Sequence, residues 1–236
     1  ANTYRRQGRG GKGIRGFRSK TGGIVEHFLV ANTHDHLLFF TNLGKVYRLR
    51  AYELPEQGRE AQGHNLINIL PVQQNERATA VLAIPNFEAG DYLVFGTRLG
   101  EVKRTALTQF VSVRSTGLLA MDVNEDDELV WVRLVTGETH TMFFTRRGMA
   151  IRFPLDTIRA SGRTSGGVRA IRLTKDDEVV AMDLTQDEGF VLVITTNGYG
   201  KKMAVTEFRP QGRGGQGLKA ITLSEKTGQV ADARTL

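Results

Sequence analysis

Two glycine-rich segments with interleaved basic residues are the clearest candidates for chemistry in this sequence of 236 residues. The segment 7–13 reads QGRGGKG, and the segment 211–217 repeats it almost unchanged as QGRGGQG. Glycine has no Cβ, so its backbone N–H groups can approach an anion closely, while Arg and Lys supply charge and several hydrogen-bond donors. This combination suits phosphate groups, and two near copies argue against a chance match.

The charge distribution supports an anionic partner. The first 25 residues contain seven basic side chains and no carboxylate, whereas acidic residues gather at 124–128 and 175–178. The whole chain has 32 Lys and Arg against 25 Asp and Glu, a formal net charge of +7. Clustered positive charge attracts nucleic acid or an acidic protein surface, and charge alone leaves both open.

The basic residues follow an internal repeat of about 50 residues. In four places an apolar segment runs into Thr, two further residues and Gly, which predicts a strand and a tight hairpin turn. The residue four positions after each hairpin Gly is basic, and we expect it to point outward. The four glycines are Gly44, Gly100, Gly148 and Gly198, and the four basic residues are Arg48, Arg104, Arg152 and Lys202.

A Gly-rich loop with an arginine follows each hairpin and leads into a short apolar segment that we predict to be a strand. The loop arginines are Arg59, Arg114, Arg163 and Arg213, and the predicted strands cover 66–70, 118–123, 168–173 and 218–223. Short strands bounded by turn residues predict an all-β protein. A unit of this size cannot bury its own apolar face, so the copies should pack side by side as propeller-like blades.

This register predicts one domain over residues 1–236, built from about five four-stranded blade units of which the first is partial. We expect the partial blade at 1–36 and successive repeats at 37–90, 91–139, 140–189 and 190–236. From this count we expect a ring that is truncated at both ends.

Several other classes of site are not expected. The chain has no Cys, which excludes disulfides and thiolate chemistry and favours a reducing cytoplasm. His34 and His36 share a strand face without a third ligand, so we predict no metal, and there is no apolar run that would predict a membrane span. No P-loop occurs, and the glycine pattern at 11–16 lacks the context of a dinucleotide site, so we expect no cofactor in this chain.

At this level of detail the sequence resembles the C-terminal domain of the DNA gyrase A subunit, of the type IIA topoisomerase family. The segment 7–13 resembles the box of that family, whose usual form is Gln-Arg-Arg-Gly-Gly-Lys-Gly, and departs from it at Gly8. The segments 31–40, 44–47 and 197–202 also resemble this family. The resemblance implies a β-pinwheel, a propeller-like ring that binds duplex DNA on a basic outer rim and bends and wraps it without sequence specificity.

The resemblance also implies which functions belong to this chain and which belong to the rest of the holoenzyme. In this family, wrapping serves the ATP-dependent negative supercoiling of the gyrase holoenzyme. The expected partners are double-stranded DNA and, in the holoenzyme, the remainder of the gyrase A subunit together with the gyrase B subunit. No membrane partner is expected. Catalysis, ATP and Mg are expected only in the rest of the holoenzyme, in the bacterial cytoplasm at the nucleoid. Tyr4 is not expected to be a nucleophile, since no orienting base accompanies it.

The predicted DNA-binding set joins the box to the repeated basic positions. Two alternatives remain: the C-terminal domain of the topoisomerase IV counterpart of gyrase A, whose box is usually degenerate and which wraps DNA poorly, and a non-enzymatic propeller scaffold that binds acidic proteins. The predicted DNA-binding residues are Arg5, Arg6, Gln7, Arg9, Lys12, Arg15, Arg48, Arg59, Arg104, Arg114, Arg152, Arg163, Lys202 and Arg213, with the box glycines Gly8, Gly10, Gly11 and Gly13.

Overall fold

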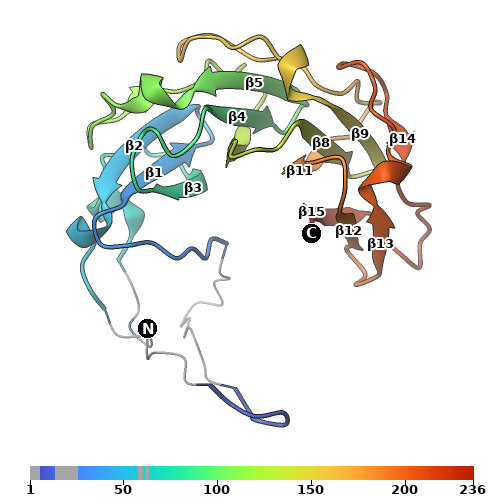
Figure 1. The fold of residues 1–236 in the computed structure, drawn as a ribbon, viewed down its shortest axis with the longest axis horizontal. Coiled ribbons are helices and arrows are strands. Elements are labelled where there is room, and N and C mark those ends of the chain that lie inside the picture. Colours follow the sequence, from blue (N-terminus) through green and yellow to red (C-terminus); the bar gives the residue numbers. More distant parts are fainter. Residues whose placement is uncertain (1–5, 14–25, 58–60, 62–63) are drawn as a thin grey trace.

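Four β-sheets follow one another in chain order around an arc (Figure 1). The structure is a computed structural model that describes residues 6–13, 26–57, 61 and 64–236. Within these residues the regular structure consists of strands and short 3-10 turns, which confirms the all-β prediction. The turns are η1 (Ala51–Glu53), η2 (Leu66–Asn68), η3 (Leu107–Phe110), η4 (Leu155–Thr157) and η5 (Val205–Glu207).

Each sheet contains a hairpin, at the four positions that the sequence predicts, and in the three four-stranded sheets this hairpin forms the middle. In each turn the Gly has a positive φ, between 73° and 85°, and its N–H donates to the Thr carbonyl three residues earlier. The Thr hydroxyl accepts from the N–H of the residue after the Gly, so the Thr and the Gly of the pattern close the same turn. The hairpins are β1 (His36–Thr41) with β2 (Lys45–Arg50), β4 (Tyr92–Thr97) with β5 (Glu101–Ala106), β8 (His140–Thr145) with β9 (Met149–Pro154), and β12 (Phe190–Thr195) with β13 (Gly200–Ala204).

Each hairpin is flanked by an inner strand from its own repeat and, in three sheets, by a short outer strand from the following repeat. The sheet orders are β3-β1-β2-β6, β10-β5-β4-β7, β11-β8-β9-β14 and β13-β12-β15. This exchange of outer strands links neighbouring repeats through backbone hydrogen bonds. The inner strands are β3 (Ala78–Ile84), β7 (Leu129–Leu134), β11 (Val179–Thr185) and β15 (Val230–Thr235), and the outer strands are β6 (Leu118–Leu119), β10 (Val168–Arg169) and β14 (Leu218–Lys219).

The prediction of a strand at 66–70, the first of the four segments that follow the loops, is wrong. Residues 66–68 form the 3-10 turn η2, whereas the later segments form β6, β10 and β14, each of only two residues. Those three strands exist because each pairs with a hairpin of the preceding sheet. Among the described residues no sheet precedes that of β1 and β2, so η2 has no hairpin of an earlier repeat to pair with, and its Leu66 packs against the first sheet.

Apolar clusters fill the spaces between successive sheets. Phe40 of the first sheet meets Phe95 of the second edge to face, with 5.7 Å between ring centroids, and Phe144 meets Phe208 at 6.2 Å further along. The strand β8 lies between two sheets, and β1 lies between the second sheet and the segment 66–72, so both strands are buried along their whole length. The stacking of sheets thus fixes where the outer edge of each one lies.

Candidate nucleic-acid interface

The Gly-rich loops of the second, third and fourth repeats run along the convex side of the arc, opposite the inner strands (Figure 1). These three loops are each held to a basic strand position of the preceding sheet by a backbone hydrogen bond: Arg48 N to Arg114 O at 3.4 Å, Ser161 N to Arg104 O at 2.9 Å, and Gln211 N to Arg152 O at 2.8 Å. The strand exchange therefore brings the two predicted basic sets together. We call the surface formed by Arg48, Arg104, Arg114, Arg163, Lys202 and Arg213 the convex rim.

The first pair on the convex rim is Arg48 with Arg114. Both line a hollow of about 330 Å³ together with Arg50. The Arg48 guanidinium carbon lies 5.7 Å from the centroid of the Phe87 ring, and Nη1 donates to Val111 O at 2.9 Å. Arg114 is exposed. A guanidinium has five N–H donors, so most of those on both side chains stay available to a ligand.

The second pair is Arg104 with Arg163. The Arg104 guanidinium carbon lies 4.6 Å from the centroid of the Tyr92 ring, a stacking distance that restricts its orientation. Arg163 Nη1 donates to Leu119 O at 3.4 Å. Both side chains are half-buried, so they are partly immobilised before any ligand arrives, which lowers the entropic cost of binding.

Lys202 on the fourth sheet and Arg213, whose loop is bonded to the third sheet, are both exposed. The Lys202 Nζ lies 4.0 Å from the centroid of the Phe190 ring. Arg213 Nη1 donates to Arg169 O at 2.8 Å, which repeats the Arg163 contact one repeat later. The loop arginines thus hold neighbouring repeats together and still present charge at the surface.

The prediction of an outward basic residue in every repeat is wrong for Arg152. Only 4% of Arg152 is exposed, and its guanidinium donates to Asp187 Oδ1 at 2.6 Å and to Phe208 O at 3.4 Å. Buried charge is tolerated when it is paired and hydrogen-bonded, and both conditions hold here. Arg152 is therefore a structural residue of the third sheet and does not belong to the convex rim.

The predicted box is described over residues 6–13, all of which are exposed. Gly11 N donates to Gly8 O at 3.1 Å, and Gly13 N donates to the Gln7 side chain at 2.9 Å. Gly10 and Gly13 have φ of 85° and 73°, and Gly214 and Gly217 at the matching positions have 82° and 80°. The glycine pattern therefore specifies one turn conformation in both copies. Arg6, Arg9 and Lys12 are exposed on the described box, whereas the predicted sites Arg5, Arg15 and Arg59 lie outside the described residues.

Gly8, where the chain departs from the usual box, has room for a larger residue. A Cβ added there would meet no atom within 4 Å, and its φ is not positive. The arginine of the usual form would therefore fit this backbone.

The sequence-based prediction missed two basic residues beside the loops, Arg159 and Arg209. Both are exposed and take part in no ion pair within the described chain. A signal was available, because Arg159 and Arg209 precede Arg163 and Arg213 by four residues each, and Arg5 precedes Arg9 in the same way.

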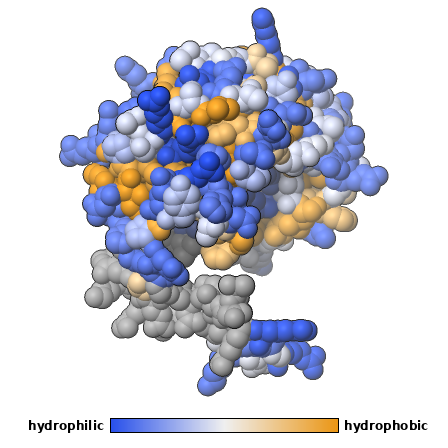
Figure 2. Space-filling model, turned by 60° about the vertical axis from the view of Figure 1, so that its left-hand side comes forward, coloured by the Kyte–Doolittle hydropathy of each residue, from blue (hydrophilic) through white to orange (hydrophobic). Residues whose placement is uncertain are grey.

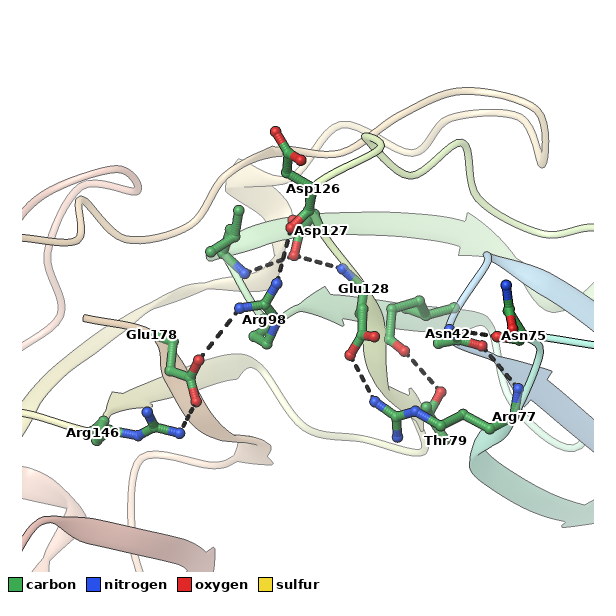
Figure 3. Close-up of polar contacts among 12 residues, drawn as sticks. Asn42, Asn75, Arg77, Thr79, Arg98, Asp126, Asp127, Glu128, Arg146 and Glu178 are labelled. Carbon is green, nitrogen blue, oxygen red and sulfur yellow. Dashed lines mark hydrogen bonds and ion pairs between the residues drawn. The ribbon is translucent and has the colours of Figure 1, made fainter. Parts of the chain in front are cut away.

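Arginines at the hairpin tips are neutralised, in contrast to those of the convex rim (Figure 3). Arg77 pairs with Glu128 at 2.6 Å, Arg98 pairs with Glu178 at 3.4 Å, and Arg146 also pairs with Glu178. The acidic turns 124–128 and 175–178 lie at these tips, where Asp127 Oδ1 accepts from Leu99 N at 2.8 Å. The acidic side chains therefore organise the tips.

The described surface offers little other binding chemistry. Figure 2 shows hydrophilic side chains over much of the face in view, with apolar residues between them. Among the described residues no three His, Asp or Glu side chains gather as a metal site. No described helix is long and apolar enough to cross a membrane.

Stacked sheets that exchange their outer strands and carry cations on the convex side define a propeller-type repeat protein. A sequence model for the family "DNA gyrase C-terminal domain, beta-propeller" matches residues 1–32, 35–84, 91–136, 140–186 and 189–236. The chain belongs to this family.

Individual proteins agree with this assignment. The chain is 46% identical over 167 residues to the DNA gyrase A subunit of Halalkalibacterium halodurans, and 43% identical over 165 residues to that of Salmonella typhimurium. These matches cover 71% and 70% of this chain but only 20% and 19% of the relatives, so the matched part is about a fifth of their length.

Solved structures confirm the fold. A DNA gyrase A C-terminal domain superposes with a TM-score of 0.77 at 25% identity, covering 100% of this chain and 77% of that one. The C-terminal domain of a DNA topoisomerase IV gives a TM-score of 0.77 at 29% identity, covering 86% and 64%. The β-pinwheel prediction is thus confirmed as a fold.

Proposed function

We propose that this domain binds duplex DNA along the convex rim without sequence specificity, and that it bends and wraps the DNA to serve negative supercoiling by a gyrase holoenzyme. The observation that carries the proposal is the pairing of cations from adjacent repeats at successive sheet edges. The pairs are Arg48 with Arg114 and Arg104 with Arg163, while Lys202 and Arg213 add exposed cations further along the arc.

The chemistry of the convex rim favours phosphate as the ligand. Its side chains present point charges and guanidinium donors, and phosphate contacts of this kind fix position without reading sequence. The Gly-rich turns add backbone N–H groups beside them. None of the six rim cations forms an ion pair among the described residues, whereas carboxylates at the hairpin tips are paired with Arg77, Arg98 and Arg146.

The arrangement of the cations on an arc favours bending. A straight duplex would reach only some of them, whereas a curved one can reach cations of successive sheets (Figure 1). Bending a site of 20 to 30 base pairs costs roughly 1–6 kcal/mol, which the additional phosphate contacts can offset.

The remaining roles are part of the same proposal. Catalysis, ATP and Mg would belong to the remainder of the gyrase A subunit together with the gyrase B subunit, with which this domain would act in the bacterial cytoplasm at the nucleoid. The two relatives named above, which extend well beyond the matched part, support this assignment.

Ligation of nicked circular DNA in the presence of the protein tests wrapping directly. We expect the wild-type chain to shift the linking number of the sealed circles, and R104A/R163A to lose the shift. R77A/R98A removes the same charge from the ion-paired tips and should keep it. Tight binding without a shift would contradict wrapping, and equal loss in both double variants would contradict the convex rim as the DNA path.

A further inference from the structure

Lys103 lies buried beneath the loop that carries Arg163. It is on β5, next to Arg104, and only 1% of it is exposed. Its ammonium donates to three backbone carbonyls: Arg163 O at 2.6 Å, Ala120 O at 2.8 Å and Ser165 O at 3.0 Å. An ammonium has three donors, so all of them are used within the protein.

The three acceptors belong to different parts of the chain. Ala120 follows β6 in the repeat of Lys103, whereas Arg163 and Ser165 are in the Gly-rich loop of the next repeat. That loop borders a cavity of about 460 Å³ lined by Lys103, Arg159 and Gly162. Because the loop lines this cavity, polar anchors contribute much of what holds the loop in place.

The same position differs in the other repeats. The residue three places after the hairpin Gly is Tyr47, Lys103, Ile151 and Lys201 in turn. Lys201 repeats the bond of Lys103, from Nζ to Ala220 O at 3.3 Å, yet Lys201 is exposed, and its Nζ has that one bond among the described residues. Lys201 is therefore a matched comparison with the same side chain and the equivalent alanine carbonyl, but without the loop.

Two charged groups face the Lys103 ammonium. Burial and the nearby positive charge of Arg163 lower the pKa of Lys103 to about 8, while Asp122 acts in the opposite direction. The Phe95 ring centroid is 5.7 Å away and is not titratable.

We infer that Lys103 is a positioning residue of the proposed DNA interface, whose ammonium holds the loop with Arg159 and Arg163 against β5 and releases it on losing its proton. This inference rests on the proposed function. A neutral amine has two donors in place of three, so one buried carbonyl loses its partner and the loop is less firmly anchored. A phosphate beside Arg163 offsets the guanidinium charge and raises the pKa of Lys103, so DNA binding is coupled to proton uptake.

The size of the effect follows from the protonated fraction. With a pKa of about 8, Lys103 is about 90% protonated at pH 7 and about 10% at pH 9. If only the anchored loop binds DNA, the Kd rises by up to about tenfold over this range at constant salt.

Fluorescence anisotropy with a labelled duplex at pH 7 and pH 9 tests this coupling. Wild type and K201M should both weaken toward pH 9. K103M keeps the length of the side chain without its charge, and should bind more weakly at pH 7 and change little with pH. A K103M variant with the affinity and pH response of wild type would overturn the inference.

Hydrogen exchange of the backbone amides of 161–167, measured without DNA at pH 7, gives a second test. K103M and K103Q should exchange faster in this loop than wild type and K201M, with unchanged protection in β8 and β12. Unchanged exchange in the loop would refute the role of Lys103. If wild type bound no duplex, the proposed function would fail while the exchange result would still decide whether Lys103 anchors the loop.

Discussion

The salt dependence of duplex binding gives a quantitative test of the convex rim. Each neutralised phosphate contributes about −0.9 to the slope of log K against log salt on B-DNA. The convex rim has six cations, Arg48, Arg104, Arg114, Arg163, Lys202 and Arg213, so contact by all six predicts a slope of about −5. Contacts from the box would steepen it toward about −9. Between 50 and 200 mM salt, a slope of −5 corresponds to a loss of about 10³ in affinity.

Two of these cations can be removed with little structural consequence. Arg114 and Lys202 are exposed, and neither side chain takes part in a hydrogen bond or an ion pair within the described residues. R114A/K202A should therefore keep its thermal stability and make the slope shallower by about 2, so that the same change of salt costs about 10² in affinity.

R77A/R98A is the matched control. It removes the same total charge from the hairpin tips, where both arginines pair with carboxylates. Anisotropy titrations across the salt range should leave the slope of this variant within about 0.5 of wild type. An equal change in both double variants would mean that net charge alone governs binding, and a flat response in wild type would refute the electrostatic interface.

Three further predictions concern single positions. R152A should lower the free energy of unfolding by about 2–4 kcal/mol, because it removes a buried, hydrogen-bonded side chain. The salt slope of DNA binding should not change. A changed slope at unaltered stability would show that Arg152 contacts DNA. In urea unfolding, G44A should destabilise the protein much more than G198A, although both glycines have positive φ. A Cβ at Gly44 would lie 2.0 Å from Met121 O, whereas a Cβ at Gly198 would meet no atom within 4 Å. Equal losses of stability would mean that φ alone decides. G8R restores the usual box and should steepen the salt slope by up to about 0.9. The Tm should not fall, since nothing lies within 4 Å of the added Cβ. An unchanged slope would show that a side chain at this position does not reach phosphate.

The hairpins were predictable because their cause is local. A Thr, two residues and a Gly with positive φ close the turn through contacts within a few residues, so the pattern alone predicts it at Gly44, Gly100, Gly148 and Gly198. The two copies of the box share turn geometry for the same reason.

Features that depend on partners distant in sequence could not be predicted. Residues 66–68 resemble the segments that become outer strands, but a two-residue strand forms only where a hairpin of the preceding sheet is beside it. Arg152 occupies the same repeat position as Arg48, yet it is buried because Asp187 and Phe208 O lie within hydrogen-bonding reach.

The sequence by itself determined the strand hairpins, the repeat and the placing of cations within it, since these depend on local conformation and composition. Only the tertiary structure decided which cations are available. It paired Arg77, Arg98 and Arg146 with carboxylates, buried Arg152, and placed the ammonium of Lys103 under the loop of the next repeat. The reason is that solvent exposure and ion pairing are set by residues tens of positions away, which become neighbours only when the sheets stack and exchange strands.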